Sequence, residues 1–407
     1  MRKPGAGSVL IAGAGIGGLT AALSLHAAGI SATVIERVRE IRPLGVGINV
    51  QPQAVRTLIE LGLGRELAAT AIPTAEHVYL DRSGNPIFAE PRGLAAGYDW
   101  PQYAVHRGEL QMLLLAAVRE RLGTDAVRTG TRLERFDQTA TTVRAYVFDR
   151  TTNSAQEIEA DTLIGADGLH STVGSQLHPD QGSLLWSGVR MWRGVTEGAA
   201  FLGGRSMIIV QDGTGVQFLA YPISRRALDR GHALINWVCQ VPVSDPGPLT
   251  EDASWNRPGR TADVLPYYAG WAWSWLDVPG LITGSTEILE YPMVDRDPLP
   301  VWGRGRVTLL GDAAHPMYPV GANGASQAII DARVLAAKLA SATDPIAGLA
   351  GYDNARRGAT AGVVLANREM HRAGNAAAVR APDGLARSGE LAAITATYRH
   401  ITGRATQ

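Results

Sequence analysis

The residues with the clearest chemical use stand near the start of the chain, in a glycine-rich turn. The turn matches the pattern G-x-G-x-x-G and contains Gly13, Gly15, Ile16, Gly17 and Gly18. Glycines in this pattern let the backbone approach a pyrophosphate, whose charge the N-terminus of the next helix stabilises. Glu36, at the end of the following apolar stretch, can accept hydrogen bonds from ribose hydroxyls. The spacing favours a dinucleotide site for FAD or NAD over a turn that serves packing alone, and Glu36 disfavours a 2′-phosphate.

Two aspartates occur in later turns that each follow an apolar stretch. Asp167 precedes a glycine after residues 161–164, and Asp312 follows Gly311 after residues 306–310. Either aspartate alone is also typical of an ordinary turn or helix cap. The sequence holds no second complete G-x-G-x-x-G, so we expect one dinucleotide, and the two additional turns favour FAD over NAD.

A loop before a helix expected at 324–339 offers a place for a flavin ring. The loop contains Pro319, Gly321, Ala322, Asn323 and Gly324. The N–H groups at the start of that helix could face the flavin and stabilise negative charge near N1 and O2 of its reduced or oxygenated form. His315 is a candidate to line the same site, although a histidine that holds a turn together fits the pattern equally well.

Arg193 is a candidate for contact with a substrate. In the segment 187–196 it shares one face of an expected strand with apolar residues. A buried guanidinium needs a partner, either an internal carboxylate such as Glu197 or the carboxylate of a substrate, and both alternatives stay open. Tyr221 and Trp237, from neighbouring segments, are further pocket candidates, although aromatic residues in a sheet more often pack in a core.

The elements that must position these residues predict an α/β fold. A strand at 8–12, the glycine turn, a helix at 19–28 and a strand at 32–35 form a βαβ unit, which is typical of a parallel sheet. We therefore expect a discontinuous Rossmann-like FAD-binding domain with an inserted antiparallel-sheet substrate domain and a C-terminal helical region. The boundaries we predict are 1–178 for the first part of the FAD-binding domain (with some substrate-domain strands near 72–105), 179–297 for the mainly antiparallel domain, 298–372 for the second part and 373–407 for the helical tail. Helices are expected at 53–61, 109–122 and 390–398.

Composition excludes several other classes of protein. Lys and Arg total 38 and Asp and Glu total 38, so no net charge attracts nucleic acid or an anionic membrane. The apolar run at 9–30 is interrupted by glycines, which argues against a signal peptide or a membrane span. Cys239 is the single cysteine, so an intrachain disulfide and a cysteine metal site are excluded, and a cytoplasmic location and no metal are expected.

The three motifs, in this order, resemble those of the class A flavoprotein aromatic hydroxylases, the superfamily of para-hydroxybenzoate and salicylate hydroxylases. The resemblance implies that Asp312 contacts the ribityl chain of FAD and that the turn at Asp167 serves both FAD and the nicotinamide donor. Arg107, which opens an expected helix, becomes a flavin contact by the same resemblance, with a surface arginine as the alternative. Arg37 and Gly47 join the expected cofactor-binding residues.

Longer segments at 41–52, 106–112, 191–197, 291–300 and 319–328 resemble the phenazine-carboxylate hydroxylases of pyocyanin biosynthesis. Ala322 and Asn323 replace the glutamine and glycine of many other members, which favours this subgroup over the salicylate branch. The resemblance implies noncovalent FAD, NADH or NADPH as reductant, dioxygen as co-substrate and a flavin C4a-hydroperoxide that hydroxylates a small aromatic substrate, with loss of its carboxyl group as one outcome. A salicylate-type hydroxylase, a flavin oxidase or dehydrogenase, and a flavin-binding sensor stay open as alternatives, as do the ring position and the oligomeric state.

Overall fold

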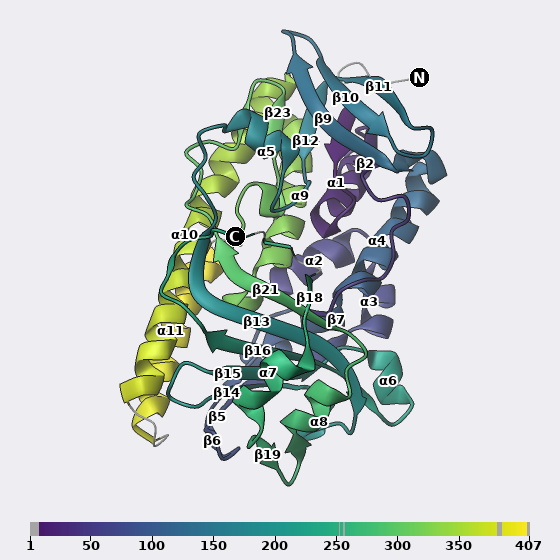
Figure 1. The fold of residues 1–407 in the computed structure, drawn as a ribbon. Coiled ribbons are helices and arrows are strands. Elements are labelled where there is room, and N and C mark those ends of the chain that lie inside the picture. Colours follow the sequence, from purple (N-terminus) through teal and green to yellow (C-terminus); the bar gives the residue numbers. More distant parts are fainter. Residues whose placement is uncertain (1–7, 252, 255–256, 381–384, 405–407) are drawn as a thin grey trace.

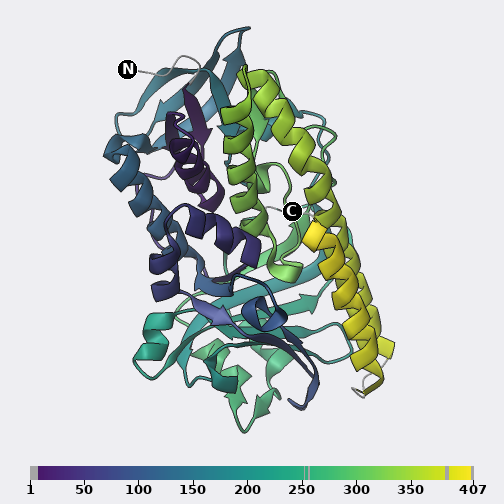
Figure 2. The ribbon, with the colours of Figure 1, turned by 180° about the vertical axis from the view of Figure 1, so that it is seen from behind.

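The computed structural model describes residues 8–251, 253–254, 257–380 and 385–404. In Figure 1 a part built around a mostly parallel sheet lies at the top and a large curved sheet lies at the bottom. Figure 2 shows helix α10 (Pro345–Arg380) running along one edge of both parts, with α11 (Leu385–Arg404) beside its lower half. The fold class expected from the sequence is confirmed, while the domain boundaries stay a prediction.

The mostly parallel sheet carries the glycine-rich turn. Its strands, in order across the sheet, are β22 (Gly303–Arg304), β23 (Val307–Leu309), β12 (Thr162–Gly165), β1 (Val9–Ala12), β2 (Ala32–Glu36) and β8 (Val127–Thr129). All neighbours are parallel except β22 and β23. The chain runs from β1 to β2 on one side and returns on the other side with β12. The C-terminal ends of β1 and β12 therefore adjoin where the strand order reverses, which is where open α/β sheets bind ligands.

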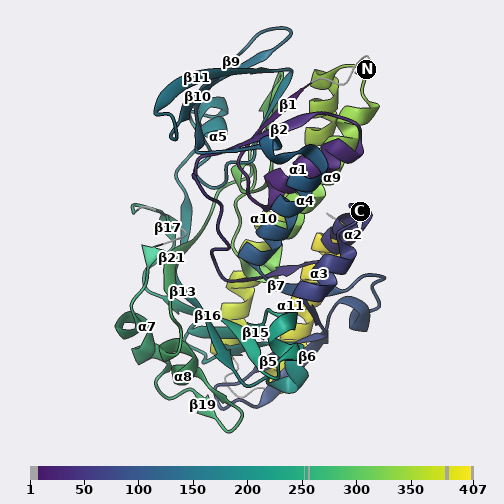
Figure 3. The same ribbon diagram turned by 90° about the vertical axis from the view of Figure 1, so that its right-hand side faces the viewer.

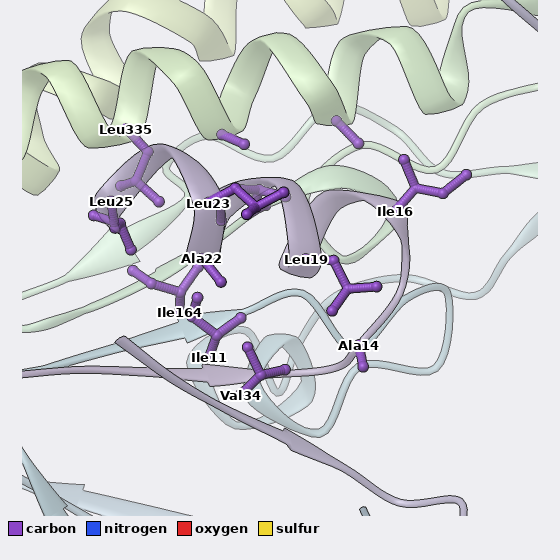
Figure 4. Packing of buried hydrophobic residues seen from close by; sticks show 14 of the residues in the cluster. Ile11, Ala14, Ile16, Leu19, Ala22, Leu23, Leu25, Val34, Ile164 and Leu335 are labelled. Carbon is purple, nitrogen blue, oxygen red and sulfur yellow. The ribbon is translucent and has the colours of Figure 1, made fainter. Parts of the chain in front are cut away.

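Helix α1 (Ile16–Ala27) covers one face of this sheet, because apolar side chains of the helix pack against apolar side chains of the strands. Figure 4 shows its Leu19 on the side of Ile11 and Val34 of the strands, and its Leu23 and Leu25 on the side of Leu335 of α9 (Gly324–Ser341). These side chains are almost fully buried. The helix ends at Ala27, and Gly29, just beyond it, has a φ of +78°, a conformation that favours glycine.

The large sheet forms the lower part of the molecule. Across it lie β18 (Arg257–Pro258), β21 (Ile288–Asp295), β13 (Leu185–Gly198), β16 (Ala233–Pro242), β15 (Gln217–Pro222), β14 (Ser206–Gln211), β5 (Glu76–Leu80) and β6 (Pro86–Pro91), and β17 (Gly247–Pro248) pairs with β13. Neighbours are antiparallel except β14 and β5, which run parallel. Strands β5 and β6 come from the first part of the chain and extend the sheet at β14. One face packs on α7 (Thr261–Tyr268) and α8 (Val278–Thr283), and the other faces the upper part; the side view in Figure 3 shows both relations.

Smaller elements complete the fold. The remaining strands are β3 (Gly47–Val50), β7 (Gln102–His106) and β4 (Ile72–Thr74) in one sheet, β11 (Ser154–Ala160), β10 (Val143–Asp149) and β9 (Thr131–Gln138) in another, and the pair β19 (Ala272–Trp273) and β20 (Leu276–Asp277). The remaining helices are α2 (Pro52–Glu60), α3 (Gly64–Thr70), α4 (Arg107–Leu122), α5 (Thr172–Leu177), α6 (Arg225–Asp229), α10 (Pro345–Arg380) and α11 (Leu385–Arg404).

The C-terminal helices differ most from expectation. Helix α11 is longer than the helix expected at 390–398, and α10 has no counterpart among the helices expected from the sequence. Glycines at 348, 351, 358, 362 and 374 interrupt the helical pattern of α10, since glycine is a poor helix former. Packing against α9 and α11 stabilises α10 in spite of them. Two parts of the predicted helical tail, residues 381–384 and 405–407, lie outside the described residues. Among the described helices, none is both long and apolar enough for a membrane span.

An ion pair attaches α10 to the large sheet. Both oxygens of the fully buried Asp295, at the end of β21, accept hydrogen bonds from Arg368 of α10, at 2.7 and 2.9 Å. Burial raises the pKa of Asp295, and the positive charge of Arg368 opposes that rise. We predict that Arg368→Met lowers the free energy of unfolding by about 3 kcal/mol or more, because it leaves a buried carboxylate without its partner.

Arg357→Met, on the same helix, is the matched control. Arg357 forms a more exposed pair with Asp353, which predicts a change within about 1 kcal/mol. Denaturant unfolding of both variants measures the difference, and equal losses would contradict a special role for the Arg368 pair.

Candidate functional site

The glycine-rich turn packs tightly on the protein side and is open on the other. Gly13 has a φ of +107°, and a Cβ there would collide with the carbonyl oxygen of Ala166, after β12. A Cβ at Gly18 would collide with the carbonyl oxygen of Gly13. At Gly15, by contrast, an added Cβ would meet no described atom within 4 Å beyond its immediate neighbours. The open space lies at the N-terminus of α1, which is where a pyrophosphate can approach the backbone.

Glu36 lies beside this turn at the end of β2. Its Oε2 accepts a hydrogen bond from the backbone N–H of Ala14 at 2.9 Å, and Oε1 accepts one from that of Val38 at 3.0 Å. A carboxylate held by two N–H groups keeps further lone pairs for hydroxyl donors. The geometry suits a ribose that lies between the turn and β2.

A cavity of about 300 Å³ lies between the upper part and the large sheet. Its walls from the upper part include Gly15, Ile16, Gly17, Gly47, Arg107, Ala166, Gly168, Gly311, Asp312, Pro319, Ala322, Asn323 and Gly324. Its walls from the large sheet include Arg193, Met207, Leu219, Tyr221, Val238, Gln240, Leu289 and Tyr291. Most of the residues that the sequence singled out for the cofactor and the substrate therefore meet in one cavity.

Asp312 is exposed to this cavity rather than to the outer surface. It lies in the turn after β23, close to Gly324 at the start of α9. Protein atoms surround the carboxyl group, and this burial raises its pKa, while the neighbouring His315 and Arg107 side chains oppose the rise. An acidic side chain next to a helix N-terminus and an open cavity can accept hydrogen bonds from the hydroxyls of a ribityl chain.

His315 supports that turn from behind and is not among the cavity-lining residues. It is buried, and its Nε2 lies 2.5 Å from Oδ2 of Asp331 in α9. The other oxygen of Asp331 accepts a hydrogen bond from Arg356 at 2.7 Å. Burial raises the pKa of Asp331, but His315 and Arg356 outweigh it and hold the pKa below its usual range. The geometry matches the alternative of a histidine that holds a turn together.

The carboxylate of Asp167 likewise forms its hydrogen bonds within its own turn. Its carboxylate accepts hydrogen bonds from the hydroxyl of Ser171 and from the N–H groups of Thr172 and Val173, at the start of α5. Burial raises its pKa, and these hydrogen bonds oppose the rise. Only its neighbours Ala166 and Gly168 line the cavity, so the geometry here is that of a helix cap.

The large sheet presents Arg193 to the cavity. Its guanidinium lies 4.0 Å from the ring centroid of Tyr291, and burial lowers its pKa, opposed by Tyr291 and Tyr221. Glu197, the internal carboxylate considered for it, lies instead on the surface, 3.6 Å from His232. Tyr221 donates a hydrogen bond to the carbonyl oxygen of Gly47 at 3.0 Å, which joins the sheet to β3.

Trp237 lies on the opposite face of the same sheet. It is fully buried in the core beneath the cavity, and its Nε1 donates a hydrogen bond to Thr196 at 3.1 Å. Side chains alternate along β16, so Val238 and Gln240 face the cavity and Trp237 cannot. The structure thus corrects the placement of Trp237 as a pocket residue.

Four other expected cofactor residues lie outside the walls of the cavity. Gly13 and Gly18 shape the turn from within, and Arg37 is exposed after β2. Gly321 borders a smaller hollow behind the loop. Arg107 lines the cavity at the start of α4, as the resemblance implied.

Sequence reasoning missed Gln240 and Tyr398. Gln240 is buried at the cavity wall, and strand alternation from Val238 could have found it. Tyr398, on α11, contacts the loop at 319–324 through hydrogen bonds. No local sequence signal connects Tyr398 with that loop, because the contact joins segments far apart in the chain.

The arrangement fits FAD. The glycine turn and Glu36 would hold the adenosine and pyrophosphate, and Asp312 and the start of α9 would face the ribityl chain and the ring. Among the described residues, no cluster of three or more His, Cys, Asp or Glu is placed to bind a metal ion. A flavin bound here would supply redox chemistry opposite an apolar sheet face.

Comparisons with known proteins agree with this geometry. Residues 7–193 and 294–366, more than half of the chain, match the FAD binding domain family. The chain is 56% identical over 400 residues to the phenazine 1,6-dicarboxylic acid hydroxylase PhzS of Lysobacter antibioticus, covering 97% of each chain. It is 32% identical over 388 residues to 3-hydroxybenzoate 6-hydroxylase 1 of Aquipseudomonas alcaligenes, covering 92% of each. The structure of Klebsiella pneumoniae HpxO complexed with FAD and uric acid aligns with a TM-score of 0.76 and 28% identity, over 99% of this chain and 94% of that one.

The family resemblance seen in the motifs is confirmed, and FAD is the cofactor. The two matched segments flank much of the large sheet, in agreement with a discontinuous FAD-binding domain. The chain belongs to the family of FAD-dependent aromatic hydroxylases.

Proposed function

We propose that this enzyme hydroxylates a phenazine carboxylate, with electrons from NADH or NADPH and one oxygen atom from dioxygen. The observation that carries the proposal is the guanidinium of Arg193, half-buried where it lines the apolar, sheet-lined end of the cavity. The 56% identical relative is named for hydroxylation of a phenazine dicarboxylic acid, which supports the same substrate class. We also place the enzyme in the cytoplasm, where a chain whose single cysteine is buried needs no disulfide.

The end of the cavity that would hold the substrate is suited to a flat, acidic molecule. Leu219, Val238 and Leu289 supply apolar surface for fused rings. Arg193 supplies a planar, permanently charged partner for a carboxylate, and the ring of Tyr291 holds the guanidinium in place. Burial raises the pKa of Tyr291 to about 12, so its hydroxyl stays protonated and can donate.

Gln240 adds a second point of recognition. Arg193 pairs with Val238 across the β13–β16 ladder, and Gln240 lies two positions further along β16 on the same face. Such diagonal neighbours are about 7–8 Å apart. A ring substituent or ring nitrogen next to the carboxylate-bearing ring would therefore lie within reach of the amide.

Bound FAD supplies the redox and oxygen chemistry, and the residues supply position and environment. The apolar lining excludes water from the reacting carbon, and the N-terminus of α9 stabilises negative charge on the cofactor. Arg193 would orient the carboxylate-bearing carbon toward the cofactor.

We further propose that hydroxylation removes the carboxyl group. Transfer of oxygen to the carboxylate-bearing carbon leaves an sp³ centre, and cleavage of the bond to the carboxyl group returns an electron pair to the ring and restores aromaticity. One carboxylate, one dioxygen, one NAD(P)H and two protons then give one phenol, carbon dioxide, NAD(P)⁺ and water. Hydroxylation of salicylate or another fused aromatic is the alternative on the same scaffold.

Glu36→Lys should lose most of the FAD, because it removes the carboxylate beside the glycine turn. We expect the dissociation constant for FAD to rise about tenfold to a hundredfold, measured by flavin fluorescence titration of the apoprotein. Glu40→Lys, at an exposed residue of the same segment that pairs with Arg42, should leave FAD affinity unchanged. A folded Glu36→Lys variant with full FAD affinity would count against the ribose contact.

Arg193→Met should weaken binding of phenazine-1-carboxylate about tenfold or more while FAD stays bound, because the carboxylate loses its charged partner. Phenazine-1-carboxamide, with the same shape and no charge, should lose much less affinity, as measured by flavin absorbance changes. Arg190→Met is the control on the opposite face, where Arg190 pairs with Glu290 and Glu251. Loss of folding by Arg193→Met alone would favour a structural role for Arg193.

Analysis of the products distinguishes decarboxylative hydroxylation from the alternative reactions. We predict that enzyme, NADH or NADPH, labelled dioxygen and phenazine-1-carboxylate or phenazine-1,6-dicarboxylate give a product that lacks one carboxyl group and carries one labelled oxygen by mass spectrometry. A product that retains the carboxyl group and gains oxygen would contradict decarboxylation. Turnover of salicylate alone would contradict the phenazine assignment, and unlabelled product would indicate an oxidase or dehydrogenase.

A further inference from the structure

The loop between Pro319 and Gly324 has a conformation that it needs help to keep. Gly321 and Ala322 both have positive φ, +68° and +55°, and for alanine this left-handed conformation is unfavourable. Ala322 also lines the cavity directly before α9. A loop that is both strained and next to the cofactor must be held by contacts from elsewhere in the chain.

Those contacts come from α11. The Tyr398 side chain is buried, and its hydroxyl accepts a hydrogen bond from Nδ2 of Asn323 at 2.5 Å. The same hydroxyl donates to Oδ1 of Asn367, on α10, at 2.6 Å, and the carbonyl oxygen of Val320 lies 3.3 Å away. A Cβ added at Gly321 would collide with Tyr398, so the phenol ring fills the space directly behind the loop.

Asn367 extends this chain of hydrogen bonds to the other end of the loop. Its Nδ2 donates to the carbonyl oxygen of Tyr318 at 2.9 Å, and Asn367 is fully buried. Tyr318 and Asn323 both line the cavity. One buried chain, from Asn323 through Tyr398 and Asn367 to Tyr318, therefore fixes both ends of the loop.

We propose that Tyr398 is a positioning residue for the flavin. Through Asn323 and Asn367 it sets where the loop and the first N–H groups of α9 meet the isoalloxazine ring. Negative charge on reduced flavin is stabilised by those N–H groups only if the loop holds them in place. The inference rests on FAD binding and does not depend on the phenazine substrate.

The test compares Tyr398→Phe with the unmodified enzyme. The variant keeps the ring and removes the hydroxyl, which leaves the buried amides of Asn323 and Asn367 without that partner. We expect the FAD dissociation constant to rise about tenfold and the midpoint potential of bound FAD to become more negative. Hydrogen–deuterium exchange without added FAD should be faster in residues 318–325 than in the unmodified apoprotein.

Tyr268→Phe is the matched control, because its buried hydroxyl also bonds to the backbone, at 2.8 Å from the carbonyl oxygen of Gln217, on the other face of the large sheet. We expect it to lower thermal stability without changing FAD affinity, potential or exchange at 318–325. Tyr398→Phe that behaves in the same way would overturn the proposal. If Tyr398→Phe is not recovered folded, Asn367→Ala decides by the same three measurements, and unchanged values would overturn the proposal.

Discussion

The close packing of the turns at the ends of three strands is the constraint on which the site depends. The turn after β1 touches the turn after β12 where no side chain fits, at Gly13 against Ala166. A Cβ at Gly17 would lie 2.6 Å from the side chain of Leu310, which follows β23, so α1 also packs closely on the third turn. Because these turns approach so closely, the N-termini of α1 and α9 open into one space. Glycine stands at these positions because a larger side chain would not fit between the turns.

Residues whose role is local could be predicted from the sequence, and residues whose role depends on long-range packing could not. The glycine turn and Glu36 follow from one βαβ unit, so spacing alone located them. Arg193 was located by alternation along its own strand. Trp237 was misplaced because alternation fixes which residues share a face, and which face meets the cavity depends on how the whole sheet packs. Tyr398 gave no signal, since its contact with Asn323 forms only when α11 packs beside the loop.

The C-terminal helices act as the link between the cofactor and the sheet. Helix α10 contacts the large sheet through Arg368 and Asp295, and it contacts α9 through Arg356 and Asp331. Its Asn367 also donates a hydrogen bond to Tyr318, directly before the loop at 319–324. Helix α10 therefore connects the loop, α9 and the large sheet, beside the link that Tyr221 makes to β3. This explains why a glycine-interrupted helix with little helical pattern of its own persists: its stability comes from buried polar contacts on both sides.

The same reasoning bears on substrate choice. The half-buried guanidinium of Arg193 is unfavourable in an apolar site, and the lowering of its pKa by burial shows the direction of that cost. The face of Tyr291 offsets part of it. A carboxylate offsets more, because it brings opposite charge and two acceptor oxygens to the planar donor. If the substrate binds there as proposed, an uncharged aromatic of the same shape would remove water from the guanidinium without bringing an opposite charge, so the site would disfavour it more strongly than shape alone requires. The proposed site would thus select for charge as well as for flatness.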